Sequence, residues 1–339
     1  MFATMHQIKH IAGRRLARMA AGLALFLICG QAQAGEGQYA TAPYSAELEP
    51  IAPIPQPPEA DPRKLALGER LFADTRLSRD GSRACITCHD IHTNGAHGNR
   101  RDHALDGTEL PFNTGTVFNA TLSFRLTWEG RLRTLEEEID VAIQNPDIMG
   151  TTMENVLRRL DADQETVRLF EKTYGHRPDR ESLLDAMTTY ERSLLTPGSR
   201  FDRWLGGDTA ALSMQELDGY KLFKKLGCIS CHQGMNVGGN LFERYGIFDS
   251  AASSKREMLR VPSLRNVAVT APYFHDGRIP TLDEAVRRMG KAQLNQTLSD
   301  DQVDAIVAFL KTLTGNYRGR PLTAPPPTPE ASAVTGTAR

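Results

Sequence analysis

Two copies of one pentapeptide constrain this 339-residue chain more than any other feature of its sequence. The first copy is Cys85-Ile86-Thr87-Cys88-His89, and the second is Cys228-Ile229-Ser230-Cys231-His232. Cys-x-x-Cys-His is the attachment site of c-type haem. The two thiols bond covalently to one haem, and the adjacent histidine ligates its iron. The sequence therefore predicts two covalent haems, held by Cys85, Cys88, Cys228 and Cys231, with His89 and His232 as iron ligands.

The placement of the cysteines weighs against other chemistry. The chain has five cysteines, and the fifth, Cys29, lies in an N-terminal segment of its own. Zinc sites and disulfides also use paired cysteines, and disulfides are common in exported proteins. The two motifs share one spacing, end in histidine and hold every cysteine after Cys29. We therefore prefer haem to zinc or disulfide chemistry.

Residues 1–34 have the three parts of a secretory signal. A charged region runs from Lys9 to Arg18, an apolar run from Met19 to Ile28, and Ala32-Gln33-Ala34 forms a small-residue cleavage site. The apolar run is short for a membrane span, although an uncleaved anchor is the alternative. We predict cleavage before Gly35 and a periplasmic location. Because 40 basic and 41 acidic side chains nearly balance, no nucleic-acid partner is expected.

The sequence also repeats itself internally. Gly68-x-x-Leu71-Phe72 precedes the first haem motif, as Gly219-x-x-Leu222-Phe223 precedes the second. Trp128 is the ninth residue after Asn119, and His275 is the ninth residue after Asn266. Capping-box patterns follow at Thr134-x-x-Glu137 and Thr281-x-x-Glu284. We predict a mainly α fold of two homologous cytochrome c-like domains, each with one covalent haem, related by a pseudo-twofold repeat.

The composition of the chain indicates where its domains begin and end. Residues 35–61 are rich in proline and read as an extended leader outside the core, and the proline-rich end of the chain reads as disordered. Ser213-x-x-Glu216 and Ser299-x-x-Gln302 are typical helix starts. We expect a signal peptide over 1–34, a leader over 35–61, an N-terminal domain over 62–205, a C-terminal domain over 206–315 and a disordered tail over 316–339.

The repeat also predicts different surroundings for the two irons. Without gaps, Met289 in the second half stands opposite Ala142 in the first. A methionine thioether ligates haem iron and raises its potential, whereas alanine cannot ligate. Met235 and Met258 are rival ligands, and Met289 could instead be a packing residue. The second haem is thus expected to transfer electrons, and the first to keep an open or exchangeable site for a small oxidant.

The chain resembles the bacterial dihaem cytochrome c peroxidase family, which includes the MauG-type enzymes that form tryptophylquinone. The resemblance runs from about Lys64 to Thr314 and includes Trp128-Glu129-Gly130-Arg131, Val261-Pro262-Ser263-Leu264-Arg265-Asn266 and Thr270-Ala271-Pro272-Tyr273-Phe274-His275-Asp276-Gly277. It implies that Met289 is the axial methionine of the electron-accepting haem, where the tryptophylquinone-forming members have a tyrosine. It also implies that Trp128 lies between the haems and that Asn113, Thr270 and Pro272 hold a calcium ion.

The same resemblance implies reduction of hydrogen peroxide to water, with electrons from a small c-type cytochrome or a cupredoxin. A homodimer is a further expectation. The runner-up hypothesis is a MauG-like oxidase that acts on a tryptophan or tyrosine of a partner protein. A third hypothesis is a dihaem electron carrier without a catalytic site.

The proton-transfer groups depart from the family pattern. Where the family has a glutamine and a glutamate, this chain has Glu138 and Ile148. A carboxylate can move a proton between peroxide oxygens, and isoleucine cannot. We therefore predict Glu138 as the catalytic acid–base residue, on the helix face of Ala142, with an exposed surface charge as the alternative. In the preceding loop, His103 is nearest the family's exchangeable histidine ligand but two residues out of register. His92 and His97 also lie in that loop.

Overall fold

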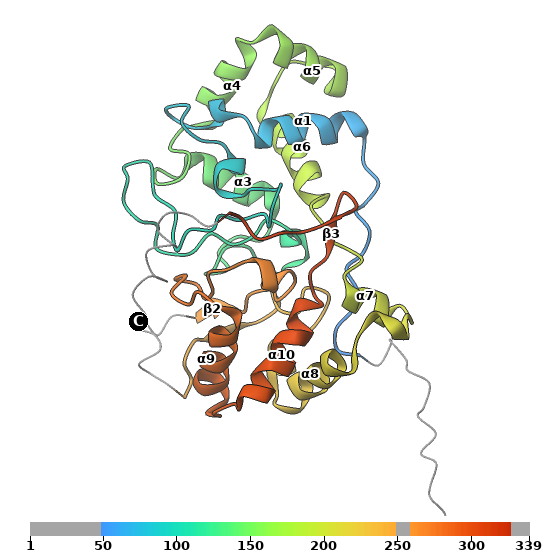
Figure 1. Cartoon of the computed structure of the whole chain (residues 1–339). Coiled ribbons are helices and arrows are strands. Elements are labelled where there is room, and N and C mark those ends of the chain that lie inside the picture. Colours follow the sequence, from blue (N-terminus) through green and yellow to red (C-terminus); the bar gives the residue numbers. More distant parts are fainter. Residues whose placement is uncertain (1–48, 249–257, 327–339) are drawn as a thin grey trace, which may run out of the picture. The chain divides into compact units, whose positions relative to one another are not determined.

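The computed structural model describes residues 49–248 and 258–326, all within the structural unit Tyr44–Arg339 (Figure 1). The signal segment, the start of the leader and the end of the tail lie outside the described residues. The α-helices are α1 (Pro62–Phe72), α2 (Cys85–Cys88), α3 (Leu135–Gln144), α4 (Met153–Asp161), α5 (Gln164–Tyr174), α6 (Arg180–Arg192), α7 (Arg200–Leu205), α8 (Met214–Lys225), α9 (Leu282–Leu294) and α10 (Asp300–Lys311).

The described residues otherwise form short turns and two small antiparallel pairs. The 3₁₀ turns are η2 (Thr75–Leu77), η3 (Ala120–Leu122), η4 (Thr209–Ala211), η5 (Cys228–Ser230) and η7 (Val267–Val269). Strand β1 (Phe242–Arg244) pairs with β2 (Met258–Arg260), and β3 (Asn316–Tyr317) pairs with β4 (Arg320–Pro321). The mainly α prediction is therefore confirmed. Among the described residues, no helix combines the length and apolar character needed to cross a bilayer.

Side-chain caps explain where the main helices begin. Capping boxes start α3 at Thr134, α8 at Ser213 and α10 at Ser299, as the sequence predicts. At α9, Thr281 accepts a hydrogen bond from the Glu284 N–H, which is half of the expected box. Each cap satisfies backbone donors that the first helical turn leaves open.

Each half is built on a close crossing of two helices. In the first half α1 crosses α6, and in the second half α8 crosses α10 (Figure 1). A Cβ atom at Gly68 would collide with the carbonyl oxygen of Ala186, and one at Gly219 would collide with that of Ala305. Only glycine allows the backbones to approach so closely. The repeated glycines therefore have one role, which is to permit these crossings.

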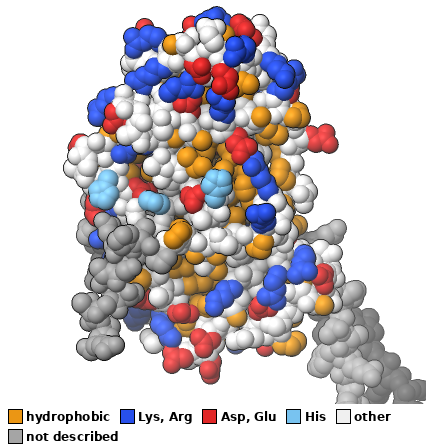
Figure 2. Space-filling model, turned by 45° about the horizontal axis from the view of Figure 1, so that its top comes forward, with side chains coloured by type: hydrophobic (Ala, Val, Ile, Leu, Met, Phe, Trp, Pro, Cys, Tyr) orange, Lys and Arg blue, Asp and Glu red, His pale blue; other side chains and the backbone are white. Residues whose placement is uncertain are grey.

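The structure extends the repeat beyond the sequence match. Phe72 packs on Tyr190 in the first crossing with ring centroids 5.5 Å apart, and Phe223 packs on Phe309 in the second at 5.2 Å. Helices α6 and α10 are thus counterparts. Their equivalence is hidden in the sequence because α4 and α5 are inserted before α6. Lys and Arg side chains are prominent at the end of the molecule that carries these two inserted helices (Figure 2).

Counterpart asparagines join the halves. Asn119 and Asn266 are buried and have left-handed backbones, with φ of 62° and 63°. Their Nδ2 atoms both donate to the hydroxyl of Thr196, over 2.8 Å and 3.0 Å. Thr196 is 1% exposed. This buried contact is one point at which the two repeats meet.

The structure corrects three expected boundaries. The leader is extended, but Ile51 belongs to the core of the second half, and the Gly234 N–H donates to the Pro50 carbonyl. Helix α7, assigned to the first domain, packs there too because Phe201 stacks on Trp204 and contacts Tyr220. The assignment of 316–339 to disorder is wrong for residues 316–326. These residues form β3 and β4, and Leu322 is buried in the first half.

Candidate haem centres

The first haem motif forms one helical turn, α2, whose end fixes the orientation of His89. The backbone N–H of His89 donates to the Cys85 carbonyl over 3.0 Å. The ring Nδ1 lies 3.3 Å from the carbonyl oxygen of Gly95. A histidine held through Nδ1 presents Nε2 to a metal. Burial lowers the pKa of His89, which favours the neutral imidazole that iron requires.

The second motif repeats this geometry in turn η5. The His232 N–H donates to the Cys228 carbonyl over 3.0 Å, and its Nδ1 lies 3.3 Å from the carbonyl oxygen of Val237. Burial lowers the pKa of His232 to about 4. Among the described residues, the four motif cysteines form no disulfide. The donor set of each half therefore fits a covalent haem with one histidine ligand.

The three methionine candidates differ in exposure. Met235 is 42% exposed and Met258 is 49% exposed, whereas Met289 on α9 is half-buried. An iron ligand must be withdrawn from solvent with its haem, so this difference favours Met289. Its counterpart Ala142 is half-buried on α3, as the repeat predicts. The iron–methionine bond itself stays a prediction.

Trp128 and His275 bring the two halves together at a second point. Their ring centroids lie 6.4 Å apart in an edge-on arrangement. The Trp128 Nε1–H donates to the Asn113 carbonyl over 2.8 Å, and the Asn113 N–H donates to the His275 carbonyl over 2.7 Å. The side-chain Nδ2 of Asn113 donates to two carbonyls, of Asn99 and Arg100, both over 3.1 Å. Its Oδ1 therefore faces away from that loop and suits a cation-binding role.

Glu138 is half-buried, and its two acidic neighbours have other contacts. Burial raises the pKa of Glu138, an effect that Arg260 opposes. Glu136 pairs with Arg192 over 2.9 Å. The Glu137 carboxylate accepts the N–H of Arg133 over 2.8 Å as part of the α3 cap. Among these three acids, Glu138 is the one whose pKa is raised by burial.

The structure adds a second carboxylate, Glu191 of α6, which sequence reasoning missed. Burial raises the pKa of Glu191 well above its usual range, and repulsion from Glu138 adds to the shift. Both carboxylates also affect the first haem motif, because each raises the pKa of Cys85 beyond the effect of burial. Two half-buried acidic side chains therefore lie close enough to the first haem motif to act on it electrostatically. The repeat could have identified Glu191 if α6 had been aligned with α10. The counterpart of Glu191 is the buried Leu310, so a carboxylate at this position is unusual.

Arg260 of the second half contacts the segment of the first half that precedes α3 and acts electrostatically on Glu138. Its Nε donates to the Thr127 carbonyl over 3.1 Å, and its backbone N–H donates to the Trp128 carbonyl over 2.8 Å. Burial lowers the pKa of Arg260, and Glu138 opposes that shift. Ile148, at the family's glutamate position, packs instead against the apolar core of the first half.

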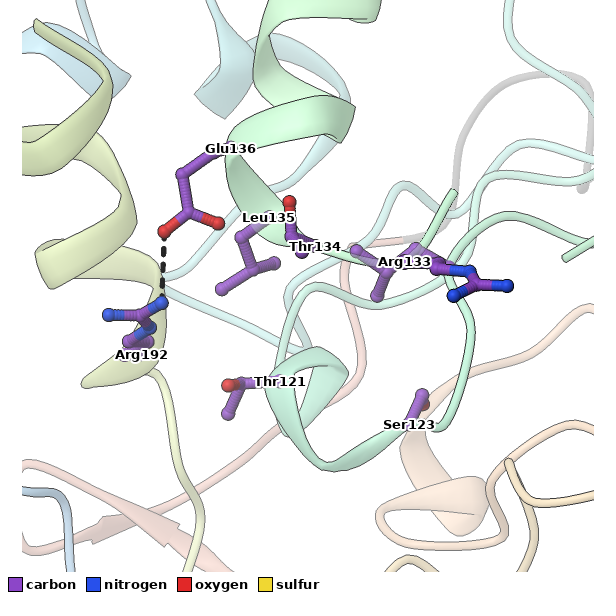
Figure 3. A pocket seen from close by; sticks show the side chains of 8 residues that line it. Thr121, Ser123, Arg133, Thr134, Leu135, Glu136 and Arg192 are labelled. Atoms are coloured by element: carbon purple, nitrogen blue, oxygen red, sulfur yellow. Dashed lines mark hydrogen bonds and ion pairs between the residues drawn. The ribbon is translucent and has the colours of Figure 1, made fainter. Parts of the chain in front are cut away.

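A small polar pocket opens beside the start of α3 (Figure 3). It has a volume of about 180 Å³ and its lining carries two guanidinium groups, of Arg133 and Arg192. Glu136 and Arg192 form an ion pair on one side of it, and Thr121 on turn η3 and Ser123 just after that turn also line it. The pocket is therefore a mixed polar site, with Arg133 as its second guanidinium, beside the helix that carries Glu138.

The loop histidines have separate surroundings. His103 is exposed, which weakens its candidacy as an exchangeable ligand. The Nδ1 of His97 lies 2.7 Å from the carboxylate of Asp102, which is itself 5% exposed. The charge of Asp102 also raises the pKa of His89, against the larger effect of burial. The part of this loop around His97 is thus organised by the buried Asp102.

The fold and the two motif sites define a dihaem c-type cytochrome. A family model described as di-haem cytochrome c peroxidase matches residues 62–210, and one described as cytochrome c matches residues 217–314. The cytochrome c551 peroxidase of Nitrosomonas europaea is 36% identical over 85% of this chain and 91% of its own length. The chain belongs to the di-haem cytochrome c peroxidase family, and it is an oxidoreductase with two haems.

Other relatives refine this placement. The cytochrome c peroxidase Ccp of Escherichia coli strain K12 is 38% identical over 79% of this chain, which spans 62% of that relative. The methylamine utilization protein MauG of Methylorubrum extorquens is 30% identical over 77% of this chain and 81% of its own length. Identity is thus higher to these two peroxidases than to this MauG protein. The diheme peroxidase BthA of Burkholderia thailandensis E264 shares the fold, with a TM-score of 0.64, 21% identity, and coverage of 79% of this chain and 91% of that one.

Proposed function

We propose that this protein reduces hydrogen peroxide to water, using electrons from a small c-type cytochrome or a cupredoxin in the periplasm. The observation that carries the proposal is the asymmetry of the two haem sites. The first is faced by Glu138 and Glu191, whereas α9 of the second carries a half-buried methionine. Haem iron supplies peroxide binding and electron storage when bound, and the chain supplies the proton-transfer groups and the route between the halves.

The carboxylates are proposed to handle protons. Peroxide reduction requires a group that takes a proton from one oxygen and returns it to the other. Glu138 and Glu191 repel each other in a buried setting, so one of the pair holds its proton more tightly than an exposed carboxyl does. A protonated and an ionised carboxyl side by side can give and accept a proton. Glu191 thus supplies a carboxyl group for proton transfer, which Ile148 at the family's glutamate position cannot supply.

Trp128 and His275 are proposed to form the route for electrons between the haems. Their rings meet where the two halves meet, and backbone hydrogen bonds through Asn113 fix both. The calcium ion is proposed to bind next to this contact, through the Asn113 side chain and the carbonyls of Thr270 and Pro272. Oxygen ligands of this kind suit calcium. Such an ion would hold the Trp128–His275 contact rigid.

Stopped-flow absorption with hydrogen peroxide, with and without a reduced small cytochrome, tests the function. Rapid and repeated oxidation of the cytochrome supports a peroxidase. A spectral change that persists despite the cytochrome supports the MauG-like alternative. This alternative is retained because Ile148 replaces the family's glutamate. An unchanged spectrum supports the electron carrier. N-terminal sequencing of periplasmic protein tests export, with Gly35 expected as the first residue.

A further inference from the structure

Two tyrosine hydroxyls are buried near the first haem motif, and the proposed function does not use them. Tyr190 of α6 is 1% exposed, and Tyr317 of β3 is half-buried. Both hydroxyl oxygens are shielded from solvent, and within the described residues neither has a hydrogen-bond partner of normal geometry. Burial raises the pKa of Tyr190, and the Tyr317 hydroxyl adds to this effect. Both rings also belong to the same apolar cluster.

The pair lies in the apolar cluster that contains the first haem motif. Tyr190 is one of its buried members, and Cys85, Ile86 and Tyr317 pack against the same cluster. The second half shows what this position means for a haem. There Phe309 packs on Phe223, whose ring lies 6.3 Å from that of His232. By the repeat, Tyr190 stands where Phe309 stands and is expected to lie beside the first haem.

A phenylalanine would pack equally well at this position, as Phe309 does in the second half. A buried hydroxyl without a good partner is unfavourable and calls for an explanation. The chain also brings a second phenol to the first. The segment that carries Tyr317 is fixed to the first half by a two-pronged Arg318–Glu69 ion pair, at 2.8 and 2.7 Å, and by the Tyr317–Phe118 ring contact at 4.9 Å.

We propose that Tyr190 and Tyr317 form a redox pair that carries an oxidising equivalent from the first haem toward the surface when no electron donor is bound. This inference rests on the proposed reaction with peroxide. Tyr190 gives one electron toward the haem and loses its phenolic proton. Reduction of hydrogen peroxide to water consumes electrons and protons in equal number, so both are taken up there. The hydroxyl hydrogen atom of Tyr317 then passes to the Tyr190 oxygen, which breaks one O–H bond and forms another. The oxidised phenol remains at half-exposed Tyr317.

Spin trapping followed by mass spectrometry tests the pair. The dihaem holoprotein is treated with hydrogen peroxide and 2-methyl-2-nitrosopropane without a donor, and tryptic peptides are analysed. Cleavage after Lys311 and Arg318 gives a peptide over 312–318 in which Tyr317 is the one tyrosine. We expect the trap adduct on this peptide in the parent, and its loss in Tyr190→Phe and Tyr317→Phe. Tyr174→Phe is the control, because the Tyr174 hydroxyl has its own partner, Asp185, at 2.8 Å; it should leave the adduct unchanged.

Equal adduct in the parent and Tyr190→Phe would overturn the proposal, as would a parent whose adducts form only on other residues. Oxidation of a reduced cytochrome by peroxide is measured in parallel and should be the same in all three variants. If the parent does not react with peroxide at all, the proposed function fails. The pair is then tested with hexachloroiridate, a one-electron oxidant. Adduct at Tyr317 that depends on Tyr190 supports the pair, and adduct independent of Tyr190 contradicts it.

Discussion

Trp128 and His275 occupy equivalent positions in the two halves and meet edge to face, with ring centroids 6.4 Å apart. Asn119 and Asn266, another equivalent pair, meet on Thr196. The repeat therefore does more than duplicate a haem-binding unit, because the same positions of each copy form the contact between copies. The two halves therefore share a junction that is built from equivalent residues.

Replacing Trp128 by phenylalanine should slow electron transfer between the haems. The change removes the Nε1–H that holds the Asn113 carbonyl and reduces the ring that contacts His275. Flash reduction of the holoprotein, followed by absorption changes of each haem, measures the rate. Trp204→Phe is the matched control, since Trp204 packs on Phe201 in the core of the second half. Equal rates in both variants would remove Trp128 from the route.

Met289→Ala should abolish the spectrum of a methionine-ligated haem and lower the reduction potential of that haem, because a thioether ligand raises the potential. Spectroelectrochemical titration of the holoprotein measures both properties. Met258→Ala is the control, since Met258 is 49% exposed on β2. An unchanged potential in Met289→Ala, together with a changed one in Met258→Ala, would assign the ligand to β2.

How much of this molecule the sequence predicts depends on whether the signal is local. The haem motifs and the helix starts at Ser213 and Ser299 are local patterns. Family membership confirms two haems, and the structure confirms both helix starts. The burial of Ile51 and Leu322 was missed because proline-rich composition describes the segment and not the surface it packs against. Glu191 was missed because two inserted helices separate α6 from the part of the repeat that aligns without gaps.

Removal of calcium should slow transfer between the haems. The proposed ion lies next to Asn113, which is bonded to both Trp128 and His275 through its backbone. Elemental analysis should find calcium in purified protein, and activity lost on exhaustive chelation should return when calcium is added. Asn113→Ala should reproduce the chelated state and no longer respond to calcium. Full activity without calcium, and none found by analysis, would contradict the site.

Thr196→Val should destabilise the protein by separating its halves. The hydroxyl of Thr196 accepts hydrogen bonds from the side chains of Asn119 and Asn266, and valine would leave both amides without this acceptor. An unsatisfied buried donor costs about 1–3 kcal/mol, so we expect a clear fall in the free energy of unfolding. Denaturant titration measures it. Thr173→Val should have a much smaller effect, because the Thr173 hydroxyl donates only to the Leu169 carbonyl within α5.

The ionisation of Glu191 predicts how stability changes with pH. Its pKa is well above 4.5 in the folded protein because of burial and of repulsion by Glu138. Above that ordinary pKa, the unfolded chain loses a proton that the folded chain keeps. The free energy of unfolding should then fall with rising pH, by up to about 1.4 kcal/mol per unit for one group. Glu191→Gln should remove this slope, so its stability relative to the parent should rise as the pH increases above 4.5. A constant difference would mean that Glu191 ionises normally.

Glu138→Gln should slow the reaction with peroxide while leaving both haem spectra intact. General acid–base groups contribute about 10²–10⁴ in rate, so a loss of at least about tenfold is expected in the peroxide-induced change of the first haem's spectrum. Glu191→Gln should also slow it, and the double variant should lose less than the two single losses combined, because one proton serves both groups. Glu136→Gln and Glu137→Gln are the controls on the same helical turn. Glu136 pairs with Arg192 at the surface and Glu137 caps α3, so both should react at the parent rate. If Glu138→Gln matches the controls while Glu191→Gln does not, the proton moves through α6 alone. If all four variants react like the parent, neither carboxylate carries the proton.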